Sequence, residues 1–368
     1  MQIVDIILNL GLFTGGLALL VRGSDYLIQY ATDIAKRFDV SDLLIGLTIV
    51  AIGTSLPEVL AAVAALLFGR ANLAFSNIIG SSLTNLTLIV GISAIVAPLA
   101  TNHIILDRDT KIMILTFIIV VIMLLNPLAF GYISIIESMI LILLMIAYLS
   151  FLYWGRDECD TCYQFHIFVD FFVRMRFLTT IQGKAEPPPT SRRAQKTESV
   201  AADEEAEEET RSLLMLKKEL AIIAVSLVAV GIGAQWVVTG AEYISLTFGI
   251  GESIIGFTII SLGTSLPELS VSINSARHGF GRLLIGNVVG SNIINIAMGL
   301  GFAYIFTTAP VQILSSMLQL SLLLLISIIF YYFIRKDWRV TRTEGVFLIV
   351  LYLVVQAILI GAVQSSFF

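Results

Sequence analysis

Two copies of one hexapeptide, Gly-Thr-Ser-Leu-Pro-Glu, occupy residues 53–58 and 263–268, and each copy lies inside a long apolar stretch. Each copy ends in a glutamate, Glu58 or Glu268. Acidic side chains are costly to place inside a membrane and usually mark an ion or substrate pathway. A single glutamate of this kind is often a paired structural residue, but two copies in matched settings predict a functional cation site.

Each hexapeptide offers oxygen atoms in three ways. Pro57 and Pro267 lack an amide hydrogen, so each frees the carbonyl oxygen four residues earlier and predicts a broken helix. Unwound carbonyls at membrane depth suit a cation where they line a hydrated cavity. The threonine and serine hydroxyls precede the glutamate by four and three residues and therefore share its helical face. The carboxylate itself is the third source of oxygen.

A second pair of segments adds neutral ligands. Ser81 and Asn85 are spaced by four residues and project from one helical face, and Ser291 and Asn295 repeat this arrangement. The glycine before each serine belongs to a stripe of small residues that permits close helix contact. The sequence thus predicts four short oxygen-bearing segments packed together.

The ligand types favour particular ions. The motifs contain hard oxygen ligands and no histidine or cysteine, which argues for Na⁺, Ca²⁺ or Mg²⁺ over transition metals. Mg²⁺ tends to keep its waters, whereas Ca²⁺ accepts about six to eight irregularly placed oxygens, so Ca²⁺ fits better. Two carboxylates can be balanced by one Ca²⁺ or by two or more Na⁺ ions. Competition of these ions for one site is a physical basis for exchange.

The hexapeptides belong to a larger internal repeat. Residues 45–85 and 255–295 align without a gap and share 16 identities in 41 positions. Most of the identities are Gly, Ser, Thr, Asn, Pro and Glu, whereas chance similarity between apolar segments would match Leu and Ile. A further similarity between residues 23–26 and 240–243 extends the repeat toward the first apolar stretch. These matches indicate an internal duplication.

The composition is that of a multi-span membrane protein. Hydrophobic residues make up 57% and charged residues 13% of the chain, whereas soluble proteins average about 25% charged residues. We expect an all-α membrane protein with ten transmembrane helices, since about 20 apolar residues cross a bilayer. The expected spans are residues 3–22, 41–68, 73–97, 111–125, 133–153, 218–240, 252–276, 283–306, 311–334 and 343–363.

The spans divide into two halves of five, residues 1–153 and 218–368, joined by a cytoplasmic linker, residues 154–217. Five is odd, so the second half enters the membrane from the opposite side; this predicts two inverted-topology repeats with broken helices 2 and 7. Lysine and arginine fall almost entirely in loops that this topology places inside, and Arg70 is the exception. By the positive-inside rule we expect a multi-pass protein of the cell (plasma) membrane with both termini outside.

The linker is polar and mixed in composition. A proline-rich stretch, residues 186–193, precedes the acidic run 203–209, and such a composition predicts disorder. A regulatory segment that binds Ca²⁺ or a partner is the alternative. Residues 165–178 are aromatic-rich and predict an interfacial helix or a continuation of the fifth span.

Several other reactive or charged residues receive structural interpretations. Cys159 and Cys162 have a metal-like spacing but lack a fourth ligand, so two reduced cytosolic cysteines are favoured over a zinc or redox site. Asp25, Glu137 and Glu242 lie near the expected ends of spans, which favours interfacial or structural roles.

The doubled motifs resemble the two α-repeats of the cation/Ca²⁺ exchanger superfamily, specifically its Na⁺/Ca²⁺ exchanger branch. The resemblance implies that the two glutamates bind Ca²⁺ and Na⁺ alternately, that the threonines serve the central ion, and that the serines bind flanking Na⁺. It also implies two backbone-carbonyl ligands and an amide at the inner edge of each half-site, and it makes spans one and six the moving gate. The implied metal ligands are Ala51, Thr54, Ser55, Glu58, Ser81, Asn85, Ser261, Thr264, Ser265, Glu268, Ser291 and Asn295.

The resemblance implies a secondary-active antiporter that exchanges Na⁺ for Ca²⁺ by alternating access. Ca²⁺ and Na⁺ are then substrates, and we expect no cofactor, no nucleic acid and no obligate protein partner. Asn295 stands where K⁺-dependent relatives carry aspartate, which predicts K⁺-independent exchange, electrogenic if more than two Na⁺ move per Ca²⁺.

Other functions remain open at this point. A Ca²⁺/H⁺ antiporter on the same fold is the main alternative, because a desolvated carboxylate can take up a proton; the additional serines favour Na⁺. An intramembrane enzyme that uses the glutamates as an acid/base pair is disfavoured, since no nucleophile or substrate-positioning motif accompanies them. A passive channel is disfavoured by binding groups placed deep on broken helices.

Overall fold

The computed structural model describes residues 2–37, 51–101, 105–127, 130–154, 165–181, 202–306 and 309–365, which are almost entirely helical. The elements are α1 (Gln2–Arg37), α3 (Ala51–Thr54), α4 (Leu56–Leu67), α5 (Ala71–Thr84), η2 (Asn85–Ile89), α6 (Val90–Val96), β1 (Leu99–Ala100), η3 (Ile105–Thr110), α7 (Lys111–Leu124), α8 (Ile135–Trp154), α9 (Phe165–Val173), α10 (Arg176–Ile181), α11 (Ala202–Phe248), α12 (Glu252–Ile255), η4 (Gly256–Ile260), α13 (Ser261–Thr264), α14 (Leu266–Arg277), α15 (Gly281–Ile294), η5 (Asn295–Leu300), α16 (Gly301–Phe306), α17 (Ile313–Asp337), β2 (Arg339–Val340) and α18 (Arg342–Ser365). The η segments are π-helical.

Seven helices in the described ranges are long and apolar enough to cross a membrane, and one bent pair makes an eighth candidate. Two expected spans are not among them. The first is residues 41–68, of which only α3 and the 12-residue α4 are described. The second is residues 111–125, where α7 is 14 residues long and follows the π-helical η3. The structure thus shows an all-α membrane protein with about seven apolar spans, and the count of ten remains a prediction.

Residues 202–217, which we expected in the unfolded linker, are instead the first part of the 47-residue helix α11. Alanine, glutamate, leucine and lysine have high helix propensity, and glutamate near a helix N-terminus interacts favourably with the macrodipole. The segment also continues directly into an apolar span. Cys159, Cys162 and the proline-rich stretch lie outside the described residues.

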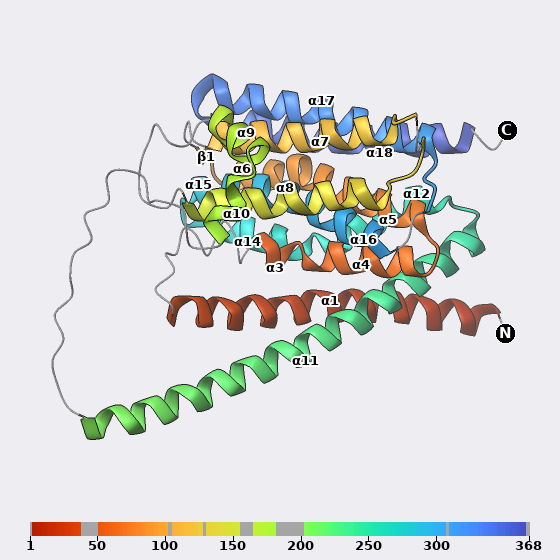
Figure 1. Ribbon diagram of the computed structural model, residues 1–368. Helices are drawn as coiled ribbons and strands as arrows, with labels where there is room; N and C mark the ends of the chain where they lie inside the picture. Colours follow the sequence, from red (N-terminus) through yellow and green to blue (C-terminus); the bar gives the residue numbers. More distant parts are fainter. Residues whose placement is uncertain are drawn as a thin grey trace.

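Helices α1 and α11 pack along each other on one side of the bundle, and α7, α17 and α18 lie on the opposite side (Figure 1). The elements that carry the two hexapeptides lie between these layers. Gly16 and Gly233 allow the close crossing of α1 and α11: a Cβ atom at either glycine would lie 2.8 Å from the backbone oxygen of the other.

The connections between helices gather at two opposite ends of the bundle. At one end Arg70, just before α5, forms an ion pair with Glu242 of α11. At the same end Val311 N donates to Gly131 O at 2.9 Å, which joins the connections after α7 and after α16. Both chain termini also lie there (Figure 1). We call this the Arg70 end.

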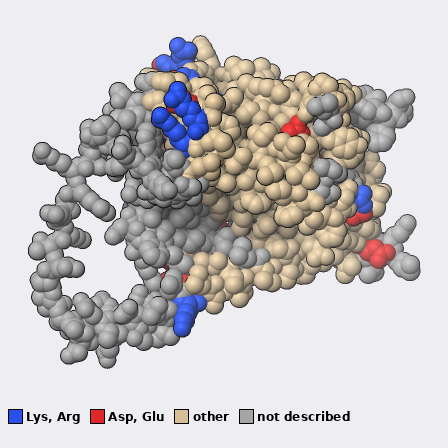
Figure 2. Space-filling model, in the orientation of Figure 1, with Lys and Arg blue, Asp and Glu red and all other residues tan. Residues whose placement is uncertain are grey.

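The other end, which we call the β1 end, holds the connections from α6 to η3, from α14 to α15 and from α17 to α18. β1 pairs with β2 in antiparallel register, so the chain before η3 contacts the chain between α17 and α18. Gly281, the first residue of α15, packs so closely on Ala100 that a Cβ atom would lie 2.6 Å from the Ala100 nitrogen. On the face shown in Figure 2, lysine and arginine gather mainly at this end.

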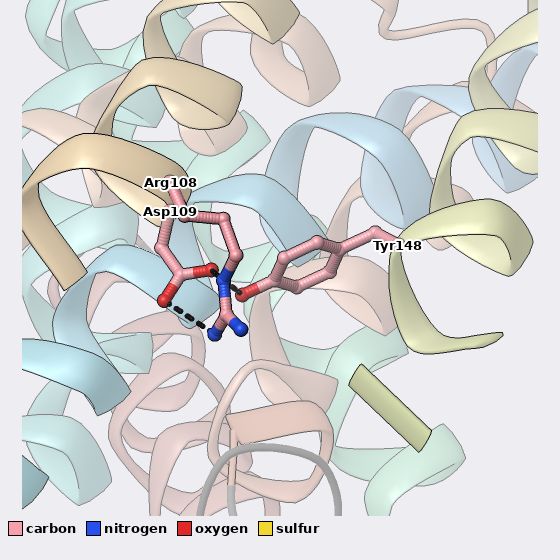
Figure 3. Close-up of polar contacts among 3 residues, drawn as sticks. All are labelled: Arg108, Asp109 and Tyr148. Atoms are coloured by element: carbon pink, nitrogen blue, oxygen red, sulfur yellow. Dashed lines mark hydrogen bonds and ion pairs between the residues drawn. The ribbon is translucent and has the colours of Figure 1, made fainter. Parts of the chain in front are cut away.

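A buried charged cluster lies near the β1 end. Arg108 Nε and Nη2 donate to the Asp109 carboxylate at 2.7 and 2.9 Å, and Tyr148 of α8 donates to the same carboxylate at 3.5 Å (Figure 3). Phe168 of α9 packs edge-on against Tyr148. Arg108, which the predicted topology placed in an inside loop, is buried and paired in the described structure. Its burial requires such pairing, because an unpaired charge away from water is strongly unfavourable.

Candidate cation site

The first hexapeptide interrupts the helix as its proline predicts. Ser55 separates α3 from α4, and its backbone N–H donates to Ala51 O at 3.2 Å. Val59 N donates back to Ser55 O at 3.1 Å, so the hydrogen-bond ladder continues on either side of Pro57. The break thereby places Glu58 in the first turn of α4.

The second hexapeptide has the same local structure. Ser265 separates α13 from α14, and the helical axis bends by 43° there. Ser265 N donates to Ser261 O and Leu269 N donates to Ser265 O, both at 3.1 Å. Glu268 accordingly occupies the first turn of α14. Two segments far apart in sequence thus present their glutamates in equivalent positions.

The Glu58 carboxylate contacts residues of the other hexapeptide. It is 0% exposed, and Ser265 Oγ donates to Glu58 Oε1 at 2.7 Å. The hydroxyls of Thr264 and Ser81 also lie near this carboxylate, although Thr264 Oγ1 donates to Ile260 O at 3.0 Å. Glu58 Oε2 has no hydrogen-bond donor among the described residues.

The Glu268 carboxylate is also 0% exposed and faces the first hexapeptide. The hydroxyls of Thr54 and Ser55 lie next to it, and the Glu58 carboxylate is close enough to act on its charge. Even so, neither Glu268 oxygen accepts a hydrogen bond from a described residue. Two buried carboxylates that lie close together are unfavourable while both are charged, unless a cation or a proton neutralises them. The unpaired oxygens are therefore candidate cation ligands.

Both asparagines of the predicted set mark the start of a π-helical segment. Asn85 begins η2 and Asn295 begins η5, at equivalent positions of the two repeats. π-helical turns inside α-helices are rare and occur frequently at functional sites, because they re-aim the side chains beside them. All four amide atoms of these two residues are buried without a hydrogen-bond partner among the described residues.

Close backbone packing holds the site segments together. A Cβ atom at Gly80 of α5 would lie 2.5 Å from Phe257 O of η4 and 2.9 Å from Ser261 Oγ. Only glycine fits there, and the contact brings Ser81 beside the second hexapeptide. The sequence pattern of small residues had predicted this close approach.

The family model described as sodium/calcium exchanger protein matches residues 8–154 and 218–361. The chain belongs to the sodium/calcium exchanger family. It is 32% identical to the sodium/calcium exchanger MaX1 of Methanosarcina acetivorans over 92% of this chain and 94% of that protein. It is also 34% identical to mouse sodium/potassium/calcium exchanger 4, but that match covers only 32% of this chain and 20% of the mouse protein.

Solved structures of the sodium-calcium exchanger NCX_Mj have the same fold. One, soaked with Na⁺ and Sr²⁺, superimposes with a TM-score of 0.57 and 28% identity, covering 96% of this chain and 99% of that one. The relatives named here are exchangers, so a transport role rather than an enzymatic one follows for a member of the sodium/calcium exchanger family.

The twelve predicted ligands of this exchanger-family chain are all buried, and each residue is at most 1% exposed. Glu58 meets Ser81, Thr264 and Ser265, whereas Glu268 meets Thr54 and Ser55. The other five make no hydrogen bond to either carboxylate in the described structure: Ala51, Asn85, Ser261, Ser291 and Asn295. The Ala51 and Ser261 carbonyls accept the Ser55 and Ser265 amides, and the hydroxyls of Thr54 and Thr264 lie at 3.5 and 3.4 Å from the same two oxygens.

Three acidic residues expected to be structural lie outside this site. Glu137 forms a capping box at the start of α8: its carboxylate accepts from Ser134 N at 2.8 Å and Ser134 Oγ at 2.9 Å. Asn126 Nδ2 donates to the same carboxylate at 2.9 Å. Glu242 pairs with Arg70 as described above, and Asp25 is exposed on α1. The structural interpretation of Glu137 and Glu242 is confirmed.

Sequence reasoning missed one residue beside the carboxylates. Asn77 Nδ2 donates to the Glu58 backbone carbonyl at 3.1 Å, and both residues are buried. The available signal was the repeat itself, because Asn77 aligns with Asn287 and lies four residues before Ser81.

Proposed function

We propose that the protein is a secondary-active antiporter that exchanges Na⁺ for Ca²⁺ by alternating access. The observation that carries the proposal is the Ser265 hydrogen bond to Glu58, which joins the two hexapeptides around buried carboxylates with unpaired oxygens. The ligands are the twelve residues named above, with Glu58 and Glu268 at the centre. Similarity to MaX1 over nearly the whole chain supports the same pair of ions.

The chemistry of the site explains why one ion replaces the other. Two adjacent carboxylates away from water repel each other strongly, so the site is most stable when cations neutralise both. One Ca²⁺ or at least two Na⁺ ions achieve this, and the surrounding hydroxyls provide neutral oxygens for either. Since both occupancies use the same carboxylates, Ca²⁺ and Na⁺ exclude each other and are carried in turn.

We infer that residues 1–153 and 218–368 are inverted five-helix repeats, joined by a linker over residues 154–217. Support comes from the directions of α5 and α15, which carry equivalent motifs. Ala71, the first residue of α5, accepts a bond from Tyr304 of α16, whereas Gly281, the first residue of α15, lies beside β1. The two helices therefore start at opposite ends of the bundle, as inverted repeats require.

We further propose that the Arg70 end faces outward and the β1 end faces the cytoplasm of a cell. The positive-inside rule supports this orientation, since basic residues gather at the β1 end. We also propose that exchange is K⁺-independent. Asn295 offers an oxygen ligand but lacks the negative charge that would help to hold another monovalent ion. Exchange is electrogenic when more than two Na⁺ move for each Ca²⁺.

Purified protein in proteoliposomes tests this function. We expect Ca²⁺ uptake into Na⁺-loaded vesicles diluted into Na⁺-free buffer, and no stimulation by K⁺. An inside-positive membrane potential should accelerate the uptake, because net positive charge leaves the vesicle when more than two Na⁺ exit for each Ca²⁺ that enters. Uptake driven by a pH gradient alone would instead favour Ca²⁺/H⁺ exchange. Empty vesicles and the Glu58→Gln variant provide the background.

A further inference from the structure

Asn77 and Asn287 are two buried amides that the function described so far does not use. They are 1% and 2% exposed. Asn77 Oδ1 and both amide atoms of Asn287 have no hydrogen-bond partner among the described residues. An amide buried without partners costs free energy, so such groups in a folded protein require an explanation.

The positions of the two amides relate them to the cation site. Asn77 lies one helical turn before Ser81 on α5, and Asn287 lies one turn before Ser291 on α15. Residues four apart share a helical face, so each amide extends the oxygen-bearing stripe of its helix by one turn. The bond from Asn77 Nδ2 to the Glu58 backbone carbonyl places the Asn77 amide against the first turn of α4, which carries one of the two carboxylates.

The two extensions run toward opposite ends of the bundle. Helix α5 starts at the Arg70 end, so Asn77 lies between Ser81 and that end. Helix α15 starts beside β1, so Asn287 lies between Ser291 and the β1 end. Each amide thus lies between the central carboxylates and one end of the bundle.

We propose that Asn77 and Asn287 are two further cation ligands, one on each access path. This inference rests on the proposed function. A neutral amide oxygen is a hard ligand that suits Na⁺ and Ca²⁺ and can replace one water of an entering ion. Asn77 receives ions that arrive from the Arg70 end, and Asn287 receives those that arrive from the β1 end. Each contributes one neutral oxygen and no charge, so the two carboxylates remain the main source of ion affinity.

Sided transport measurements test the inference. Right-side-out and inverted vesicles from bacteria that express the protein expose opposite faces, and Na⁺-driven uptake of radioactive Ca²⁺ gives the apparent KM at each face. Asn77→Ala should raise the KM about three- to tenfold in right-side-out vesicles only, the loss expected for one neutral ligand. Asn287→Ala should do the same in inverted vesicles only. Asn77→Ser and Asn287→Ser keep an oxygen and should lie between these values and wild type.

The matched control is Asn292→Ala. Asn292 is a buried asparagine on α15, one residue after Ser291 and therefore off the stripe; its Nδ2 donates to Val288 O at 2.9 Å, and its Oδ1, like Asn77 Oδ1, has no partner among the described residues. It should leave the KM at both faces unchanged. The inference would be overturned if the alanine and serine variants changed the KM equally at both faces, or changed it at neither face. The proposed function would still stand in that case, provided that wild type shows Na⁺-driven uptake. Absence of Na⁺-driven uptake by wild type would overturn the proposed function as well. A mirrored pattern would support the inference and reverse the proposed orientation.

Discussion

Ser265 Oγ donates a hydrogen bond of 2.7 Å to Glu58 Oε1, although 207 residues separate the two along the chain. The bond joins the broken helix of one repeat to the glutamate of the other. It therefore makes the two hexapeptides parts of one site, and it fixes one oxygen of the carboxylate while the other remains available to an ion.

Removal of this hydroxyl should weaken ion binding without unfolding the protein. A hydrogen bond to a charged group contributes about 1.5–3 kcal/mol, so Ser265→Ala should raise the apparent KM for Ca²⁺ and Na⁺ by roughly tenfold or more. Ser82→Ala removes a buried hydroxyl from α5 beside the site stripe and should have little effect. Ion-dependent uptake into proteoliposomes measures both, and equal losses would argue against a special role for Ser265.

The two central glutamates should be indispensable for transport but not for folding. Glu58→Gln and Glu268→Gln each remove one of the two charges that neutralise a divalent ion, so Ca²⁺ uptake should fall to background. Size-exclusion profiles should match wild type, because glutamine has the same shape and fully buried carboxylates that repel each other do not favour folding.

Glu137→Gln is the control for this pair, because Glu137 caps α8 and binds Asn126 outside the site. It should lower the free energy of unfolding by about 1 kcal/mol, the usual contribution of a helix cap, and leave transport unchanged. Loss of uptake in all three variants would show that the site has been assigned to the wrong residues.

Close packing at Gly80 should be required for the site geometry. A methyl group there would meet Phe257 O of η4 at 2.5 Å, so Gly80→Ala must separate α5 from η4. We expect a loss of about 1–3 kcal/mol in stability, as for other overpacked positions, together with impaired transport. Gly231→Ala is the matched change on α11, where a Cβ atom meets nothing within 4 Å. It should be neutral or slightly stabilising, as thermal unfolding in detergent will show.

The ion pair between Arg70 and Glu242 should contribute only modestly to stability. Both side chains are about a third exposed, at 30% and 35%, so water screens the pair. A double-mutant cycle with Arg70→Ala and Glu242→Gln should give a coupling of about 0.2–1 kcal/mol. A coupling well above that range would indicate that the pair is effectively desolvated and holds α11 to the start of α5 more firmly than its exposure suggests.

The sequence predicted the local features of the site because local chemistry determines them. Pro57 and Pro267 break their helices whatever surrounds them, and the spacing of Ser81 and Asn85 puts both on one face. The repeat identified the residues that matter, since apolar segments do not conserve glycine, asparagine and glutamate by chance. Burial of the twelve ligands does not follow from their place within apolar stretches alone, since Leu262 and Leu266 of the same stretch are exposed.

Features that depend on distant neighbours were not predictable in the same way. The burial of Arg108 depends on Asp109 and Tyr148, and Tyr148 reaches it only through the packing of α8. The helical state of residues 202–217 was missed because composition suggested disorder, whereas the apolar span that follows extends the helix through them. The π-helical turns at Asn85 and Asn295 had no recognised sequence signal beyond their repetition.

The central claim is that Glu58 and Glu268 share one transported ion. Anomalous diffraction from crystals soaked with Sr²⁺, a heavier analogue of Ca²⁺, tests it most directly. We predict an anomalous peak between the two carboxylates, within coordination distance of an oxygen from each, and no such peak in Glu58→Gln or Glu268→Gln crystals. A peak elsewhere in the protein, or carboxylates that face apart with no ion between them, would contradict the account.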